Sequence, residues 1–345
     1  TTCFPPRFGR TPGPCINSVN QLLCVDEKKK ISHTFYFLQK REEKHTITLN
    51  MSMSALTEVA KGAFARTEST FRNIIGTSPS FPPEKNRYIL IVAHACPWAN
   101  RCIMARSLFG LEQAVPMAVV HPTWAATNPN VDDHFGWVFS SPSDPPIQHP
   151  SGENEVACDE QCIPPPSHLN WPSARSVYDT SAPGATTKFT VPILYDLVEN
   201  VIVNNESSEI LRMLYDRDLL GQFATKNHAL NLYPKEKSIE IETCNDFIYP
   251  SINNGVYKCG FAHSQAAYEA AAVSLKEGLQ RVETILSASN FLCGDVLTEG
   301  LFNTYFFLET FQFYTCCGVS DFFSLFFYFL SLFSFFQLTF VCLLL

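Results

Sequence analysis

Short apolar runs and helical segments alternate between residues 88 and 215. The apolar run over 88–93 predicts a buried strand, and Pro97 then stands where the first turn of a helix over 98–109 tolerates proline. A second helix is predicted from Glu206 to about Tyr215, with Asn205 as its cap. Further strands are predicted over 115–120, 190–195 and 201–203. The order β-α-β, a loop, then β-β-α predicts an α/β domain.

Beyond residue 220 the pattern is helical throughout. Residues 264–287 repeat apolar side chains at steps of three and four, which is typical of an amphipathic helix. Residues 238–258 predict another helix, interrupted near Pro250. The predicted organisation is an N-terminal extension over 1–63, an α/β domain over 64–215 with a long Pro- and Ser-rich loop over 140–187, an all-α domain over 216–299, and a tail over 300–345.

The two ends of the chain differ from the rest. Residues 1–50 show no sustained period and lack the order of a secretory leader, so we expect the 1–63 extension to be unstructured or not native, with the working chain beginning at Met51 or Met53. Organelle targeting by this extension stays open. Of the 29 Phe, 14 fall in 301–345, and 322–345 carries no charge. Its length suits a membrane anchor, but its Phe, Leu and Ser bias and missing basic flank favour a gene-model artefact. Residues 301–345 have no polar face, so we expect that they form no amphipathic packing helix.

Composition narrows the class of protein. The chain has 345 residues, 46% of them hydrophobic, which excludes wholesale disorder, and its net charge of -8 argues against a nucleic-acid binder. The 13 Cys include no CxxC, so neither a zinc ribbon nor a dithiol pair is written locally, and we expect no metal. Cys158 and Cys162 are interpreted as two unrelated thiols in a loop. The scattered cysteines suit a reducing, cytoplasmic location.

Cys96 is the candidate nucleophile. It follows a buried strand and opens a helix, where backbone N–H groups and the positive helix end favour the thiolate. The position of a second redox cysteine is Ala99, and Cys102 lies well off the face of Cys96. The pattern therefore predicts monothiol chemistry, in which Cys96 attacks sulfur and an outside thiol releases it. A buried structural cysteine is the alternative.

Two further elements favour the chemical interpretation. Pro192 before a strand predicts a cis-proline turn that leaves the backbone of Val191 open to a peptide-like ligand. Glu206 and Ser207 at a helix start predict a seat for a carboxylate and an amine. A thiolate, an open backbone edge and such a seat together describe a glutathione site.

Residues 64–299, about two thirds of the chain, resemble the glutathionyl-hydroquinone reductases, which are the Xi class of glutathione S-transferases and similar to the Omega class. The matching runs are FAR at 64–66, ACPWA with Arg101, GWVF at 136–139, KFTVPIL at 188–194, VNNESSEI at 203–210, IYP at 248–250 with INNGVYK at 252–258, and LTE at 297–299. The resemblance implies a thioredoxin-like N-terminal domain, an all-α C-terminal domain and a homodimer.

The resemblance also implies roles at matching positions. Cys96 would attack the sulfur of a glutathionyl-hydroquinone, release the quinol and become a mixed disulfide that a second glutathione resolves. The implied contacts are Trp137 against bound glutathione, Lys188 at the glycyl carboxylate, Val191 as the backbone clamp, Glu206 and Ser207 at the γ-glutamyl group, and Tyr257 in the quinol pocket.

Two departures from the family pattern leave other functions open. Asn100 stands where His is usual, and the resemblance stops after Glu299, so the C-terminal domain looks truncated. The alternatives are a glutathione-binding protein with little turnover, and a membrane-associated form that depends on the 322–345 tail. A conjugating transferase is disfavoured, because that chemistry uses Ser or Tyr where this chain has Cys96.

Overall fold

The computed structural model describes residues 58–60, 63–150, 152, 154–184 and 188–304. The expectations for residues 1–57 and for the tail from 305 onward, including a membrane anchor over 322–345, lie outside the described residues. Within them, no helix combines the length and the hydropathy that crossing a bilayer requires.

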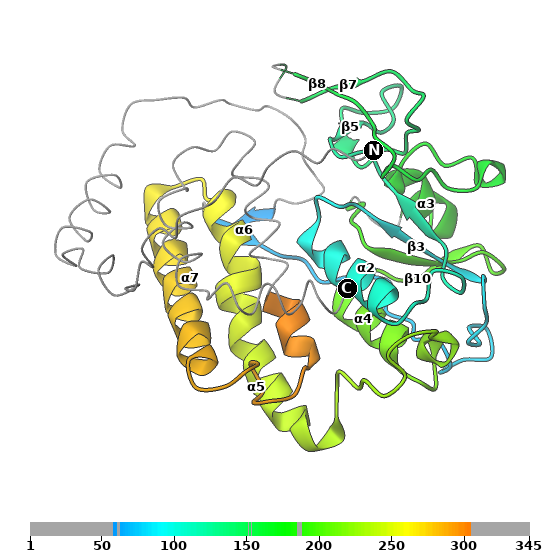
Figure 1. The fold of residues 1–345 in the computed structure, drawn as a ribbon. Helices are drawn as coiled ribbons and strands as arrows, with labels where there is room; N and C mark the ends of the chain where they lie inside the picture. The colour runs from blue at the N-terminus through cyan, green and yellow to red at the C-terminus, as the bar shows by residue number, and fades with distance from the viewer. Residues whose placement is uncertain (1–57, 61–62, 151, 153, 185–187, 305–345) are drawn as a thin grey trace, which may run out of the picture. The chain divides into compact units, whose positions relative to one another are not determined.

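A four-stranded mixed sheet forms the centre of the first domain (Figure 1), with the strand order β10-β9-β3-β4. Strand β3 (Tyr88–Val92) pairs in parallel with β4 (Met117–Val119) and antiparallel with β9 (Ile193–Asp196), which in turn pairs antiparallel with β10 (Val201–Asn204). Every residue of β3 is buried, as its continuous apolar run predicts. The predicted β-α-β, β-β-α order is confirmed.

Two helices pack together beside this sheet (Figure 1). Helix α2 (Pro97–Leu108) follows β3, and α4 (Ser207–Tyr215) follows β10. Both helices begin near the ends of buried strands, so their first turns lie where the sheet stops. This arrangement brings the start of α2 and the start of α4 into one region, although more than a hundred residues separate them in the sequence.

Residues 140–187 are more ordered than their composition predicts. They contain the hairpin β7 (Ile147–Gln148) and β8 (Glu155–Val156), a 3-10 turn and helix α3 (Ala174–Ser181). Ser173 caps α3 in a capping box, and the helix contacts β10 with Tyr178 buried. Tertiary burial of one apolar face therefore overrides the loop-like composition of this segment.

A disulfide joins Cys158 and Cys162, whose Cα atoms lie 5.9 Å apart. The interpretation of these residues as two unrelated thiols was wrong. The two thiols meet because the chain turns between them: the Cys162 amide donates to the Asp159 carbonyl, and the surrounding loop is folded. A spacing of four residues does not by itself predict such a turn. The disulfide also removes one argument for a reducing location.

A short hairpin precedes the first domain's core. Strand β1 (Glu58–Ala60) pairs antiparallel with β2 (Ala63–Ala65), so residues 58–60 and 63 of the extension that we expected to be unstructured are strand residues. A second hairpin joins β5 (Ala125–Ala126) to β6 (Phe135–Gly136).

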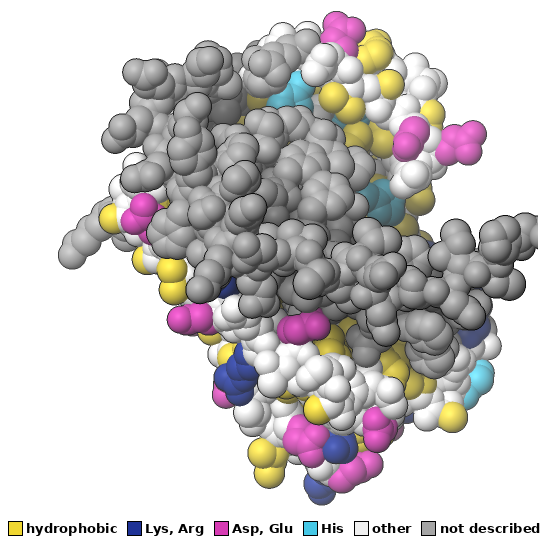
Figure 2. Space-filling view, turned by 60° about the vertical axis from the view of Figure 1, so that its left-hand side comes forward, with side chains coloured by type: hydrophobic (Ala, Val, Ile, Leu, Met, Phe, Trp, Pro, Cys, Tyr) yellow, Lys and Arg dark blue, Asp and Glu magenta, His cyan; other side chains and the backbone are white. Residues whose placement is uncertain are grey.

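The helical part follows the prediction closely. Helix α5 (Ser238–Ile248) continues through a π-helical turn (Tyr249–Asn253) into α6 (Asn254–Gly260), so the interruption falls at Pro250 as expected. Helix α7 (Gln265–Leu286) begins after Ser264, whose hydroxyl accepts from the Ala267 amide. A separate hydrophobic cluster holds these helices together. In the lower part of Figure 2, acidic and basic side chains are interspersed and hydrophobic ones are scattered.

Residues 299–304 are helical and pack into the structure. Phe302 is buried in the core of the first domain, and Asn303 and Thr304 are also buried. The expectation that the Phe-rich segment could form no packing helix is therefore corrected for its first residues. The reason is that Asn303 supplies the polar group that the contact with Arg101 and Asn253 requires.

Candidate functional site

Cys96 lies where the sequence predicts, as the N-cap residue of α2. Its side chain is buried, and its Sγ atom lies 3.4 Å from the carbonyl oxygen of Val191. The Val191–Pro192 peptide bond is cis, which confirms the prediction for Pro192. The fold thus brings the thiol and the turn before β9 into contact across 95 residues of sequence.

Burial raises the pKa of the Cys96 thiol above its ordinary value. Backbone N–H groups of Trp98 and Ala99 and the charges of Arg66 and Arg101 act in the opposite direction, but their combined effect is smaller. The helix start does lower the pKa of Cys96, as the sequence predicts, but desolvation raises that pKa by more. The thiol therefore depends on nearby positive charge for its reactivity.

Asn100 and Cys102, which follow Cys96 on helix α2, have structural roles. The Asn100 side chain donates a hydrogen bond of 2.9 Å to the carbonyl of His94, which ties the first turn of α2 to the loop before it. The Cys102 thiol donates to the Ser207 carbonyl, and burial raises the pKa of Cys102 to about 12. Cys102 is accordingly a poor thiolate near neutral pH.

Glu206, not Asn205, caps helix α4. The Glu206 carboxylate accepts from the Ser208 amide at 3.3 Å and from the Ser208 and Ser69 hydroxyls at 3.1 and 3.0 Å. Asn205 instead bridges the Phe71 amide and the Tyr178 hydroxyl, each through its side-chain amide. The prediction that Asn205 caps this helix was wrong, because tertiary partners satisfy its side chain.

Arg101 connects the starts of the two helices. Its guanidinium donates to the Ser207 hydroxyl at 2.5 Å and lies 3.8 Å from the Glu206 carboxylate. It also donates to the Asn303 side chain at 2.6 Å, and Arg101 is only 3% exposed. A buried arginine needs a compensating charge and hydrogen-bond acceptors. These three residues serve the two Nη atoms, while the Nε atom has no hydrogen-bond partner among the described residues.

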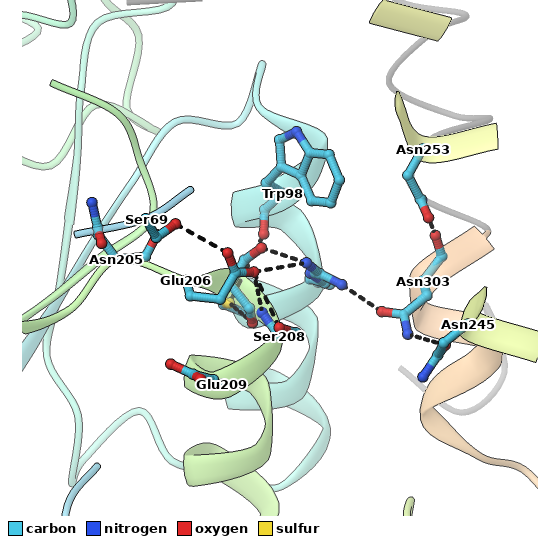
Figure 3. Close-up of polar contacts among 12 residues, drawn as sticks. Ser69, Trp98, Asn205, Glu206, Ser208, Glu209, Asn245, Asn253 and Asn303 are labelled. Carbon is cyan, nitrogen blue, oxygen red and sulfur yellow. Dashed lines mark hydrogen bonds and ion pairs between the residues drawn. The ribbon is translucent and has the colours of Figure 1, made fainter. Parts of the chain in front are cut away.

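Three asparagines continue this network toward the helical part. The Asn303 side chain donates to the Asn245 side chain at 2.7 Å, and Asn253 donates to the Asn303 carbonyl (Figure 3). Beside them lies a cavity of about 450 Å³, lined by Arg101, Glu206, Ser208 and Arg212 on one side and by residues of α5 and the π-helical turn on the other. The cavity reaches Glu206 but neither Cys96 nor Val191, so it borders one end of the predicted glutathione site.

A second ion-pair network, formed by Arg212 with Glu299 and Glu242, lines the same cavity. Arg212 donates to both oxygens of the buried Glu299 carboxylate, at 2.5 and 3.1 Å, and Tyr215 donates to the same carboxylate at 2.6 Å. Burial and the Glu299 charge raise the pKa of Tyr215. Glu299, where the family resemblance ends, is therefore fully engaged in the structure.

Trp137 and Lys188 each contact a side chain that was not among the predicted site residues. The Trp137 ring is buried and stands perpendicular to the Trp124 ring, with centroids 5.4 Å apart. Lys188 precedes the Val191 turn, and its ammonium group donates to the Thr67 hydroxyl. Contact of either side chain with bound glutathione stays a prediction.

Tyr257 belongs to an aromatic cluster on the helical side of α2. We define this cluster as Phe64, Trp98, Tyr249, Tyr257 and Phe261, whose neighbouring ring centroids lie 5.7 to 6.1 Å apart. The Arg66 guanidinium lies over Trp98 and Tyr257, at 4.5 and 4.9 Å from the ring centroids. The structure therefore places Tyr257 next to the first turn of α2, which begins at Cys96.

Sequence reasoning missed Arg66, Arg101 and Asn303. Arg66 and Arg101 both fall in the matching runs, but nothing in their local pattern says which distant groups they meet. Asn303 was assigned to the Phe-rich tail over 300–345. Among the described residues, no cluster of His, Cys, Asp and Glu could hold a metal ion.

Comparisons with known proteins agree with this geometry. The family model described as "Glutathione S-transferase, N-terminal domain" matches residues 95–217. The chain is 39% identical over 241 residues to glutathione S-transferase omega-like 2 of Schizosaccharomyces pombe, covering 69% of each protein. It is 34% identical over 253 residues to glutathionyl-hydroquinone reductase YqjG of Escherichia coli, covering 70% of this chain and 68% of that protein.

The fold agrees as well. The Xi glutathione transferase ECM4 from Saccharomyces cerevisiae, solved in complex with glutathione, is similar with a TM-score of 0.63 at 30% identity, covering 74% of this chain and 82% of that chain. Its thioredoxin-like and helical parts correspond to the two parts described here. With this identity over more than two thirds of a relative, the chain belongs to the glutathione S-transferases, a family of enzymes, and within them to the Xi class with its omega-like members.

Proposed function

We propose that this enzyme reduces glutathionyl-hydroquinones to hydroquinones, with glutathione as the reductant and Cys96 as the nucleophile. The observation that carries the proposal is the contact between the Cys96 thiol and the Val191 turn, 3.4 Å apart. This contact places a reactive sulfur beside a backbone edge of the kind that binds peptides. The relatives named as a hydroquinone reductase and as a glutathione complex support the same substrate class.

The residues present fit glutathione. Val191 is buried, and among the hydrogen bonds of the described residues none uses its amide N–H, which leaves a donor for a peptide-like ligand. At the other end, the Glu206 carboxylate is 24% exposed and suits the α-amino group of a γ-glutamyl residue. Ser207 begins α4 beside it, where helix N–H groups favour a carboxylate. We assign Trp137 to lie against bound glutathione, Lys188 to its glycyl carboxylate and Tyr257 to the quinol pocket.

The reaction divides into two sulfur exchanges. Cys96 attacks the thioether sulfur, a sulfur–sulfur bond forms, and the bond from sulfur to the ring carbon breaks. The electron pair stays with the ring, which takes up a proton and leaves as the hydroquinone. A second glutathione thiolate then attacks the Cys96 mixed disulfide, which frees the Cys96 thiolate and yields glutathione disulfide. The two sulfurs are oxidised and the ring carbon is reduced, so electrons balance.

Mass spectrometry and steady-state kinetics test this proposal. The wild-type chain should take up one glutathione on Cys96 when mixed with a glutathionyl-hydroquinone, and Cys96→Ser should lose turnover while retaining glutathione binding. Cys259 is the matched control, since it is buried in the helical part with its pKa raised to about 12. Modification of Cys259 or Cys102 in place of Cys96 would refute the assignment.

Glutathione binding without turnover would favour the alternative of a binding protein with little catalysis. We also propose, from the family resemblance, a glutathione-binding domain over 64–215, a helical domain over 216–299, a homodimer and a cytoplasmic location. Light scattering measures the oligomeric state, and cell fractionation of the full chain tests location and separates a soluble form from one attached through 322–345.

A further inference from the structure

Arg66 is held beside the reacting cysteine by two aromatic rings and one amide. Its guanidinium carbon lies 4.5 Å from the Trp98 ring centroid and 4.9 Å from that of Tyr257. Its Nε atom donates a hydrogen bond of 2.7 Å to the Asn254 side chain. Trp98 lies in the first turn of α2, so these contacts place the Arg66 charge next to the helix start that Cys96 caps.

Arg66 has no acidic partner among the described residues. It forms no ion pair there, and its hydrogen-bond partner, Asn254, is neutral. Its Nη2 atom is buried and has no hydrogen-bond partner there. Buried donors are nearly always paired in folded proteins, so this nitrogen, one of several such side-chain atoms among the described residues, is a candidate donor to a ligand oxygen.

Arg101 provides the contrast on the same ring. Its guanidinium also lies near Trp98, 5.1 Å from the ring centroid, but it is neutralised by Glu206 and hydrogen-bonded to Ser207 and Asn303. Both Nη atoms of Arg101 are thus engaged around the γ-glutamyl seat, and only its Nε atom lacks a partner among the described residues. Arg66 forms no ion pair among the described residues, and its guanidinium lies over both Trp98 and Tyr257.

The proposed reaction creates a negative charge that such a group can stabilise. When the bond from sulfur to ring carbon breaks, its electron pair remains on the ring. If the ring carbon has its neighbouring oxygen in the keto form, that pair is delocalised onto the oxygen as an enolate, which is the anion of the hydroquinone. Donors aimed at a developing oxyanion in an apolar site contribute strongly to catalysis, because the charge is poorly solvated there.

We propose that Arg66 is a catalytic residue that donates a hydrogen bond from Nη2 to a ring oxygen of the quinol and stabilises the oxyanion formed as the Cys96–sulfur bond is made. This inference rests on the proposed function and adds a residue and a specificity to it. Cys96 supplies the electron pair, the sulfur–carbon bond breaks, the charge appears on the ring oxygen beside Arg66, and a proton from solvent completes the hydroquinone. The Tyr257 ring, stacked against Arg66, forms one wall for the flat substrate.

Two substrates separate this role from the general activity of Cys96. The first is a glutathionyl-hydroquinone, in which the leaving group is the quinol ring and the negative charge develops on a ring oxygen. The second is the mixed disulfide of glutathione with 2-mercaptoethanol, in which the leaving group is a thiolate. Arg66→Met in the full chain should lower kcat on the glutathionyl-hydroquinone by about 100-fold, the typical cost of one oxyanion donor. The rate on the mixed disulfide should fall far less, and Arg66→Lys should recover part of the loss.

A matched control and a substituent series sharpen the test. Arg281 lies over the Phe247 ring at 3.9 Å in the helical part, so Arg281→Met removes a similar arginine–aromatic contact away from the site and should leave both rates unchanged. Chlorine substituents on the quinol ring lower the basicity of its oxygen, so the loss caused by Arg66→Met should shrink as chlorines are added.

The outcomes distinguish a failure of the proposed function from a failure of the role proposed for Arg66. If the wild type reduces the mixed disulfide but not the glutathionyl-hydroquinone, the proposed function fails. If the wild type turns over the hydroquinone and Arg66→Met slows both substrates equally, or slows all ring substituents equally, Arg66 has a structural role through Asn254 and the inference is overturned. Circular dichroism of Arg66→Met confirms that the variant is folded before the rates are compared.

Discussion

The Arg101 Nη1 atom donates a hydrogen bond of 2.6 Å to the Asn303 side-chain oxygen at the junction of the two domains, across 202 residues of sequence. Arg101 lies on the helix that Cys96 begins, and Asn303 lies in the short helical segment that follows Glu299. The same guanidinium contacts Ser207 and Glu206, so the proposed γ-glutamyl seat and the helical domain share one buried charge. Stability of the junction and geometry of the seat are therefore linked.

Asn303→Ala should destabilise the chain and weaken glutathione binding together. Removing the acceptor leaves the buried Arg101 charge with one partner fewer, at a cost of about 1–3 kcal/mol in the free energy of unfolding. Asn245→Ala removes the acceptor for the Asn303 amide and a 3.3 Å hydrogen bond to the Glu299 carboxylate, but Glu299 keeps Arg212 and Tyr215 and the Arg101 contact is untouched, so this variant should cost less. Urea denaturation and calorimetry of both variants measure the two effects. Equal losses for the two variants would show that the Arg101 contact has no special weight.

Glu206→Gln should weaken glutathione binding by about 1–3 kcal/mol, the usual penalty for stranding a charged partner. Glu206 also caps α4, so the amide variant is preferable to Ala because it keeps an acceptor for the Ser208 amide. Glu209→Gln is the control: Glu209 is the next acidic residue and pairs with Arg72. Isothermal calorimetry should show a loss for Glu206→Gln alone, and unchanged affinity in that variant would remove Glu206 from the seat.

Alkylation of Cys96 should speed up as the pH rises, and its midpoint should lie above the ordinary thiol value of about 8.5. The sign follows from burial, which raises the pKa of Cys96 and keeps the thiolate fraction small near neutral pH. Because the Arg66 charge lowers that pKa, Arg66→Met should move the midpoint higher still. Iodoacetamide rates read by mass spectrometry provide the curve, with Cys96→Ser as the blank. An alkylation rate that reaches its plateau below pH 8 would contradict the raised pKa of Cys96.

Cys293 should make the chain more stable at pH 8.5 than at pH 6, relative to Cys293→Ser. Its Sγ atom lies 3.9 Å from that of Cys244, and the hydrogen bond between the two sulfur atoms lowers the pKa of Cys293 to about 7. A group whose folded pKa is depressed contributes stability above its unfolded value, and that stability is lost as the pH falls through 7. Thermal denaturation at both pH values measures the difference. A gap between the two proteins that stays constant with pH would rule out a native thiolate.

The local pattern of the chain determined most of the fold and the position of the nucleophile. The apolar run of β3, the helix after Pro97 and the repeat of α7 are set by neighbours within a few residues, so they can be predicted without knowing what they pack against. The same holds for Cys96 at a helix start and for the cis bond at Pro192, which sits directly before a strand. The family resemblance added roles to these positions.

Tertiary structure alone decided which groups meet these residues. Helix α3 forms inside a loop-like composition because its apolar face is buried, and the Cys158–Cys162 disulfide forms because a folded loop brings the two thiols together. Arg66 meets Asn254 across 188 residues and Arg101 meets Asn303 across 202. Burial likewise reversed the expected direction of the Cys96 pKa. Partners, charge compensation and desolvation depend on segments far apart in sequence, and no local period carries that information.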